Sequence, residues 1–206
     1  MELSIRLKTV AEAVTKGNRV ADVGTDHGYV PIYLVKNNLS PAGIAMDVNK
    51  GPLEKAQEHI REEKIGGKIA TRLGNGLAPL EPGETDTVII AGMGGDLICK
   101  ILKAKPEFLI EGKEFILQPQ SEWFKIRRLL KEYRYQIEKE WFLKEDGKYY
   151  VMSPSEITDD LRNQAADDYA KFMTADSYKT YTKAYNVFIK KNPGYEEKIA
   201  NKLDAE

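Results

Sequence analysis

Two kinds of apolar pattern alternate along the first three quarters of the chain. Longer stretches carry apolar residues at helical spacing, and the first of them has Leu3, Leu7, Val10, Ala11 and Val14 on one face before Gly17. Short apolar runs rich in β-branched residues predict strands at 19–23, 42–47, 68–73, 86–91 and 114–118. With helices expected between these strands, the pattern predicts five β–α units and an α/β fold with a mostly parallel sheet.

The pattern changes after the fifth predicted strand. A helix is expected at 121–133, followed by two strands at 135–143 and 149–152 around Asp146-Gly147, a strong hairpin-turn signal. The sheet is therefore expected to end in an antiparallel hairpin. We expect one domain over 1–156 and a small helical extension over 157–206, where tyrosines recur at helical spacing as a packing seam or a base-stacking surface.

Composition and charge narrow the classes of function. The 206 residues contain 31 Lys and Arg against 32 Asp and Glu, so any nucleic-acid surface must be a local patch. No apolar run reaches the length of a membrane span, and the opening segment has no signal-peptide core, which favours a cytoplasmic protein without a membrane partner. One cysteine and two histidines exclude a disulfide and structural zinc, so no metal is expected. A monomer is the favoured state.

The first candidate site follows the first predicted strand, where the chain reads V-A-D-V-G-T-D-H-G-Y. In a parallel sheet, ligands bind beyond the carboxyl ends of the strands, and Gly24 and Gly28 allow the backbone to approach a ligand closely. The loop lacks the three glycines of a dinucleotide fingerprint. It carries Asp26 and His27 instead, and the negative charge suits a cationic ligand with an amino group.

Two further candidates follow the second and third predicted strands. Asp47, with Val48 after it, can accept hydrogen bonds from the ribose hydroxyls of an adenosine cofactor, which fits NAD and S-adenosylmethionine equally. Asn75 and Gly76 lie in Gly-Asn-Gly, which is either an ordinary turn or a thin loop whose amide contacts an adenine edge.

A second glycine cluster, I-I-A-G-M-G-G, ends the fourth predicted strand. Gly92 allows close backbone approach and Met93 offers an apolar wall, although a tight turn explains part of the cluster as well.

The ordered set of these motifs, together with A-M-D and F-I-L-Q-P-Q, resembles the class I S-adenosylmethionine-dependent methyltransferases. It resembles most specifically the bacterial tRNA adenine-22 N1-methyltransferase family, over about residues 1–153. The resemblance implies a Rossmann-like domain with a seven-stranded sheet, S-adenosylmethionine as cofactor and tRNA as substrate. The family also has a helical extension thought to help hold tRNA, and residues 158–206 depart from its pattern.

The chemistry of that reaction suggests catalytic residues. Methylating N1 of adenine creates a cation, so a negative group near the exocyclic amine would stabilise the transition state. Asp26 is the candidate, with contact to the cofactor's amino group alone as the alternative. Tyr29 either stacks on a flipped adenine or only packs at the start of a helix. His27 is placed beside the cofactor, because adenine N1 has no proton for a base to remove.

The candidate RNA contacts are positively charged side chains on two predicted helices. The alternative is that these side chains only form the solvent-exposed face of each helix. They are Arg6, Lys8, Lys125, Arg127, Arg128 and Lys131. The alternatives to a tRNA methyltransferase are a methyltransferase with another RNA or a small-molecule substrate, a nicotinamide dehydrogenase and an RNA-binding module without catalysis.

Overall fold

The computed structural model describes residues 2–110, 113–133, 135, 137, 139–145 and 148–152. They belong to the first of two compact units, Met1–Ile157. The predicted extension at 157–206 and its tyrosines lie outside the described residues. No helix in the described ranges is both long and apolar enough to cross a membrane.

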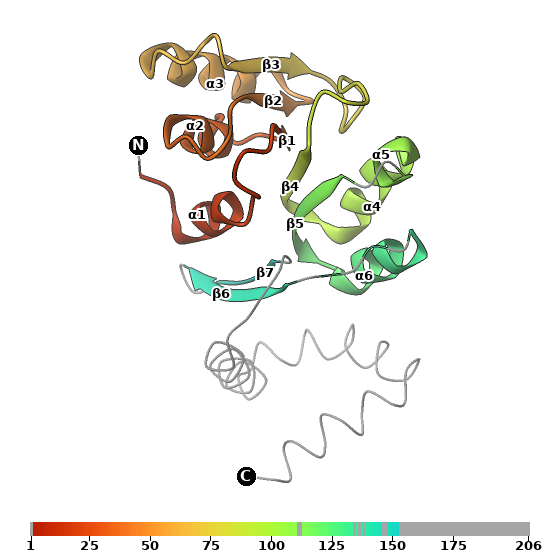
Figure 1. Ribbon diagram of the computed structural model, residues 1–206. Helices are drawn as coiled ribbons and strands as arrows, with labels where there is room; N and C mark the ends of the chain where they lie inside the picture. Colours follow the sequence, from red (N-terminus) through yellow and green to blue (C-terminus); the bar gives the residue numbers. More distant parts are fainter. Residues whose placement is uncertain are drawn as a thin grey trace, which may run out of the picture. The chain divides into compact units, whose positions relative to one another are not determined.

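A parallel sheet of five strands forms the centre of this unit, which confirms the predicted α/β fold (Figure 1). Its strands are β1 (Val20–Val23), β2 (Gly43–Asp47), β3 (Ile69–Leu73), β4 (Thr87–Gly94) and β5 (Glu114–Ser121). Their order is β3-β2-β1-β4-β5, so the chain first builds outward from β1 on one side and then returns to its other side. Ligands of such sheets bind where the order reverses, at the carboxyl ends of β1 and β4.

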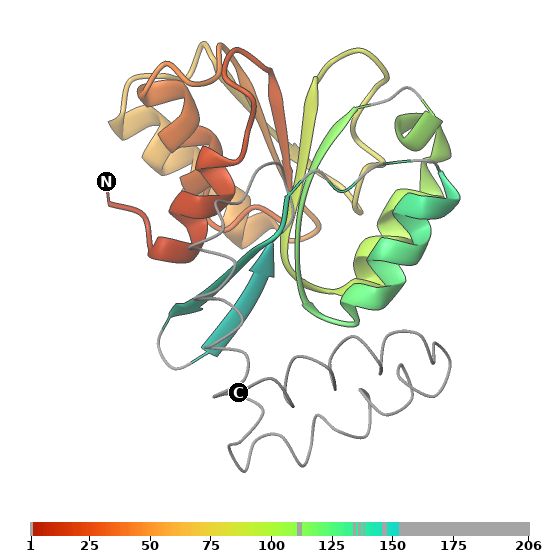
Figure 2. The same ribbon diagram turned by 60° about the horizontal axis from the view of Figure 1, so that its bottom comes forward.

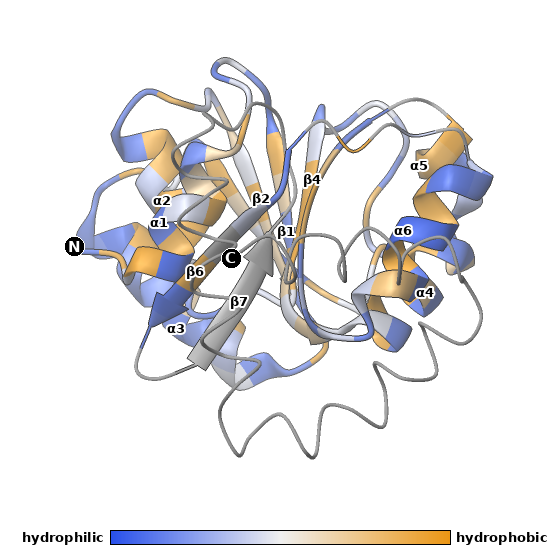
Figure 3. Cartoon of the chain, turned by 90° about the horizontal axis from the view of Figure 1, so that it is seen from below, coloured by the Kyte–Doolittle hydropathy of each residue, from blue (hydrophilic) through white to orange (hydrophobic). Residues whose placement is uncertain are grey.

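Helices cover both faces of the sheet (Figure 2). One face carries α1 (Ile5–Glu12), α2 (Tyr29–Lys36) and α3 (Lys50–Glu62), and the other carries α4 (Gly95–Ala104), α5 (Pro106–Ile110) and α6 (Trp123–Glu132). Apolar residues dominate the central strands, whereas the helices mix apolar and hydrophilic positions (Figure 3). Each helix thus buries an apolar stripe against the sheet.

The two faces follow from the alternation of side chains along each strand. In β1, Ala21 and Val23 pack with α4 and α6, whereas Val20 packs with α1 and α2. Asp22 is also buried, and by the same alternation its side chain belongs to the face of Val20. A carboxyl group therefore stands in the apolar interior, one position before the end of β1.

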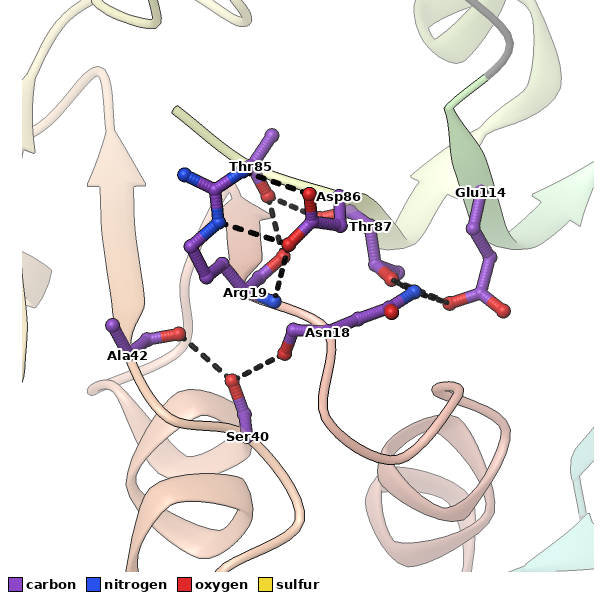
Figure 4. A network of polar contacts seen from close by, with 8 residues as sticks. All are labelled: Asn18, Arg19, Ser40, Ala42, Thr85, Asp86, Thr87 and Glu114. Carbon is purple, nitrogen blue, oxygen red and sulfur yellow. Dashed lines mark hydrogen bonds and ion pairs between the residues drawn. The ribbon is translucent and has the colours of Figure 1, made fainter. Parts of the chain in front are cut away.

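Polar contacts join the strands at the opposite, amino-terminal edge of the sheet (Figure 4). Arg19 donates to both carboxylate oxygens of Asp86 at 2.9 and 2.8 Å, and Ser40 donates to the carbonyl oxygens of Asn18 and Ala42 at 2.6 and 2.8 Å. The hydrogen bond from Arg19 lowers the pKa of Asp86 to about 2. These contacts tie the β1, β2 and β4 segments together and leave the carboxyl edge for the motifs.

The glycine cluster and the segment before β4 differ from the sequence-based expectation. No helix lies between β3 and β4: residues 74–86 form turns, and Leu77 and Leu80 are buried from them. Pro79 and Pro82 in this segment disfavour a helix. The cluster of three glycines, for which close backbone approach was expected and a tight turn was the alternative, belongs mostly to β4, which runs three residues beyond 91 with irregular pairing to β5.

The hairpin is present, but it is separate from the five-stranded sheet. Strands β6 (Trp141–Glu145) and β7 (Lys148–Met152) pair antiparallel as a two-stranded sheet of their own, so the described residues do not form one seven-stranded sheet. The first hairpin strand was expected from residue 135 and begins at Trp141. Tyr135 and Ile137 pack against the core around α4 and α6, which explains why their segment is apolar without being a strand.

Candidate active site

The glycine loop between β1 and α2 has the backbone that its glycines suggested. Gly24 and Gly28 have φ of 73° and 74°, and His27 has φ of 55°, in the left-handed region that side chains rarely allow. The amides of Gly24 and Thr25 both donate to the Met46 carbonyl at 2.8 Å. The loop is thus fixed to the end of β2, and Asp26 at its tip is exposed, with 64% of its side chain accessible.

Asp22 is a carboxyl group of this site that the sequence analysis did not single out. It accepts a hydrogen bond of 2.6 Å from the Thr25 hydroxyl, below the loop. Burial raises its pKa to about 6, and the nearby carboxylates of Asp26 and Asp47 act in the same direction. The Thr25 hydrogen bond and the charge of Arg6 oppose that rise. Three carboxyl groups therefore share the carboxyl edge of β1 and β2.

Asp47 ends β2, as predicted, and its carboxylate accepts the Asn49 amide at 2.6 Å. This contact leaves a second carboxylate oxygen for a ligand. Val48 is 61% exposed beside it. Asn75 is exposed after β3, and the Asp47 carbonyl accepts the amide of Gly74 at 2.9 Å, which places the Gly-Asn-Gly loop next to the end of β2.

Met93 of β4 lies against Gly24 of β1. A Cβ atom placed on Gly24 would be 2.1 Å from Met93 Cε, far inside contact distance. The two glycine motifs, 69 positions apart in sequence, therefore meet at the point where the strand order reverses, and the absence of a side chain at Gly24 makes this possible.

Gln118 of β5 joins the second glycine cluster to α1. Its side-chain oxygen accepts the Gly92 amide and Arg6 Nη1, both at 3.1 Å, and the residue is fully buried. Arg6, predicted to contact RNA, thus directs its guanidinium to the carboxyl ends of β4 and β5. Gln118 belongs to the F-I-L-Q-P-Q motif. This motif contributed to the family resemblance, but the sequence analysis predicted no chemical role for Gln118.

Three rings connect the loop to α3. Tyr29 stacks on His59 with centroids 5.3 Å apart and planes at 19°, and it meets His27 edge-on at 5.5 Å. His59 Nδ1–H donates to the His27 carbonyl at 3.0 Å. In the sequence, His59 is a single histidine within a predicted helix. No local pattern indicated that it would contact the loop 32 positions earlier.

Apart from Arg6, the predicted RNA-binding cations fall into two groups. Lys125 contacts Asp96 and Glu122 at 2.6 and 2.8 Å, contacts that raise its pKa, and Arg127 and Lys8 pair with Glu140 and Glu12 at 2.6 and 3.8 Å. Arg128 and Lys131 are exposed on α6 and form no ion pair within the described part of the chain. The net positive charge of α6 therefore lies mainly on these two residues.

The assembled site is a glycine-lined strand edge with three carboxyl groups, an amide and aromatic rings. Carboxylates there can accept hydrogen bonds from hydroxyls and stabilise a cation. Within the described ranges, no group of three or more His, Cys, Asp or Glu side chains has the arrangement of a metal site.

Comparison with known proteins gives consistent matches. The methyltransferase domain family matches residues 3–153. The tRNA (adenine(22)-N(1))-methyltransferase of Bacillus subtilis (strain 168) is 39% identical over 159 residues, which cover 77% of this chain and 67% of that protein.

Two solved structures are similar over comparable lengths. TrmK of M. capricolum, in complex with S-adenosyl-homocysteine, has a TM-score of 0.68 and 34% identity, covering 74% of this chain and 68% of that one. Sp1610 of Streptococcus pneumoniae, in complex with S-adenosyl-L-methionine, has a TM-score of 0.70 and 35% identity and covers 78% of both chains.

Proposed function

Because this chain belongs to the methyltransferase domain family, and within it to the tRNA adenine-22 N1-methyltransferases, we propose that it transfers a methyl group from S-adenosylmethionine to N1 of adenine 22 in tRNA. The observation that carries the proposal is the convergence of Asp22, Asp26 and Asp47 with the two glycine motifs at the point where the strand order reverses. A tRNA substrate supports the expected cytoplasmic location.

The residues at this edge fit the proposed cofactor. Asp47 has a carboxylate oxygen for ribose hydroxyls, and Val48 and Asn75 are exposed beside it for the adenine ring. Gly24, Gly28 and Gly92 have the positive φ that the backbone along this edge requires, and Met93 and His27 border the same edge. The acidic loop complements a positively charged molecule. S-adenosylmethionine, when bound, supplies an electrophilic methyl group on a sulfonium.

Asp26 and Tyr29 are the residues we assign to the target base. Asp26 is exposed at the loop tip, where its charge can stabilise the cation that N1 methylation creates. Tyr29 begins α2 immediately after the loop and presents a ring to a base drawn out of the RNA stack. Arg6 and Gln118 border the same edge from α1 and β5, which supports a contact of Arg6 with the part of the tRNA that enters the site.

The function is tested by methyl transfer to an unmodified tRNA transcript, followed by mapping of the modified nucleotide. We expect the methyl group on N1 of A22 and none on a transcript with guanine at that position. Incorporation at another nucleotide would identify a different RNA substrate. Binding of tRNA without S-adenosylmethionine binding or methyl transfer would favour the non-catalytic module, and binding of NAD instead would favour the dehydrogenase.

Asp47→Ala should weaken S-adenosylmethionine binding about tenfold to hundredfold. The substitution removes a charged acceptor for the ribose hydroxyls, a loss of roughly 1.5 to 3 kcal/mol. Isothermal titration calorimetry measures the affinity, and Asp86→Ala, which removes a carboxylate at the opposite edge of the sheet, is the matched control. Wild-type affinity in Asp47→Ala would remove Asp47 from the cofactor site.

The double variant Arg128→Glu/Lys131→Glu should weaken tRNA binding and its salt dependence. Each phosphate contact releases counterions, so losing two should flatten the log–log salt slope by about one to two. The control is Lys16→Glu/Lys68→Glu, the same charge change on exposed lysines near the amino-terminal edge. If both double variants keep the wild-type slope, α6 does not contact the phosphates and the tRNA surface lies elsewhere.

A further inference from the structure

His59 lies outside every motif of the sequence and yet contacts the most unusual part of the candidate site. His27 has a backbone conformation that non-glycine residues rarely adopt, and it lies between Asp26 and Gly28 at the tip of the loop. The His27 carbonyl accepts the hydrogen bond from His59 Nδ1–H at 3.0 Å. Such a conformation persists only where the surroundings hold it in place.

Two more contacts from the same helix act on the loop. A Cβ on Gly28 would lie 3.1 Å from Ala56 Cβ, so α3 already packs closely against the backbone of the loop one turn before His59. The His59 ring also stacks on Tyr29, whose hydroxyl lies 3.5 Å from His27 Nδ1. His27, Gly28 and Tyr29, the three residues that follow Asp26, are therefore all in contact with α3.

Helix α3 is itself firmly packed, so it can hold the loop in place. Leu53, Ala56 and Ile60 are buried, so α3 is fixed against the sheet along one face while His59 projects beside that face toward the loop. Asn49, the N-cap residue of α3, donates its amide to Asp47 at the other candidate ligand position. One helix thus adjoins both the proposed ribose contact and the loop of the proposed base contact.

From this geometry we propose that His59 is a positioning residue, which fixes the His27 peptide and the Tyr29 ring so that Asp26 and Tyr29 face the target adenine. The role toward adenine rests on the proposed function. His59 itself acts through His27 and Tyr29, and the necessary feature is an N–H donor at the position of Nδ1 together with a flat group beside Tyr29.

Three substitutions separate the donor from the ring. His59→Asn keeps an amide N–H close to the Nδ1 position, His59→Gln moves the amide about one bond farther along the side chain, and His59→Phe keeps a ring without a donor. Glu58→Ala, an exposed neighbour on α3, is the control for substitution on this helix. The comparison of His59→Asn with His59→Gln uses two polar substitutions, so it does not depend on whether His59→Phe folds.

Hydrogen exchange of the peptide covering residues 22–30, measured on the protein alone, reports the loop directly. Loss of one hydrogen bond should speed exchange of the loop amides roughly five- to tenfold in His59→Gln and His59→Phe, whereas His59→Asn and Glu58→Ala should stay within about twofold of wild type. Equal exchange in all four variants would overturn the positioning role, whether or not the protein methylates tRNA.

Single-turnover methyl transfer at saturating cofactor and tRNA tests the consequence for the reaction. We expect a rate about five- to tenfold lower in His59→Gln and His59→Phe, and recovery to within about threefold in His59→Asn, with KM for tRNA little changed. Faster loop exchange with an unchanged rate would overturn the link to the target base. Inactivity of the wild-type protein on tRNA would refute the proposed function instead, and exchange would still decide the role of His59 in the loop.

Discussion

Asp26→Asn is expected to retain the fold and much of the cofactor affinity while methyl transfer falls by roughly 10² to 10³, or about 2.7 to 4 kcal/mol. A neutral amide cannot stabilise the positive charge that develops on adenine as N1 accepts the methyl group. The Asp26 side chain is exposed, so substitution there leaves the core unchanged. A bound base would exclude water from the carboxylate and strengthen its effect on the transition state.

The single-turnover rate with saturating cofactor and tRNA is the appropriate measurement, because defects in binding do not affect it. Glu54→Gln, which neutralises an exposed carboxylate on α3, is the matched control and should keep the wild-type rate. A rate within about threefold of wild type, combined with weaker cofactor binding, would assign Asp26 to the cofactor alone. Alignment of the two substrates would then have to account for catalysis.

Asp22→Asn should make the protein without cofactor more stable at pH 7.5, by about 2 to 3 kcal/mol. A carboxyl pKa raised to about 6 by burial means that the charged form is disfavoured in the folded protein. A side-chain amide carries no charge, and its oxygen can still accept the Thr25 hydroxyl. Functional sites often retain such destabilising groups, and removing them stabilises the protein at the expense of activity.

The contribution of Asp22 to the free energy of unfolding becomes more favourable as the pH falls. The folded protein protonates Asp22 near pH 6, whereas the unfolded chain does so near its ordinary value of 3.8. Wild-type stability from this group therefore increases as the pH falls from about 7 to 4, and the advantage of Asp22→Asn shrinks over the same window. Glu84 and Asp86, whose pKa values are lowered to about 2 by Arg72 and Arg19, have the opposite dependence, with stability lost as the pH falls below about 4.

Urea denaturation between pH 4 and pH 8 measures this difference. Asp86→Asn is the control of opposite sign: it should destabilise the protein at neutral pH, because its partner Arg19 loses a charged acceptor. If Asp22→Asn is less stable than wild type at pH 7.5, the carboxylate of Asp22 is favourable in the folded protein and its burial is compensated by contacts stronger than those to Thr25 and Arg6.

The strands and the ligand motifs could be predicted from the sequence because both depend on local patterns. The buried runs of β1, β2 and β4 are apolar enough to be recognised alone, and Gly24 and Gly28 have the positive φ that their loop required. Asp47 was placed correctly at the end of β2, since a strand end is visible as the point where an apolar run stops.

Tertiary packing determined the helix and strand boundaries that the apolar pattern of the sequence predicted incorrectly. Leu77 and Leu80 are apolar because they cover the core from turns, and Tyr135 and Ile137 because they pack beside α6, so apolar content in those segments did not indicate helix or strand. Irregular pairing with β5 extends β4 through most of the second glycine cluster. Pairing between segments distant in sequence has no local signal, so the sequence could not predict this extension.

The same distinction holds within the candidate site. The sequence determined that acidic residues and glycines follow successive strands, and the order of these motifs identified the family. Only the tertiary structure brought Met93 onto Gly24, Arg6 and Gly92 onto Gln118, and His59 onto the His27 carbonyl. Each of these contacts joins segments at least 26 positions apart, so its existence depends on how helices and strands pack and not on the residues beside it in the chain.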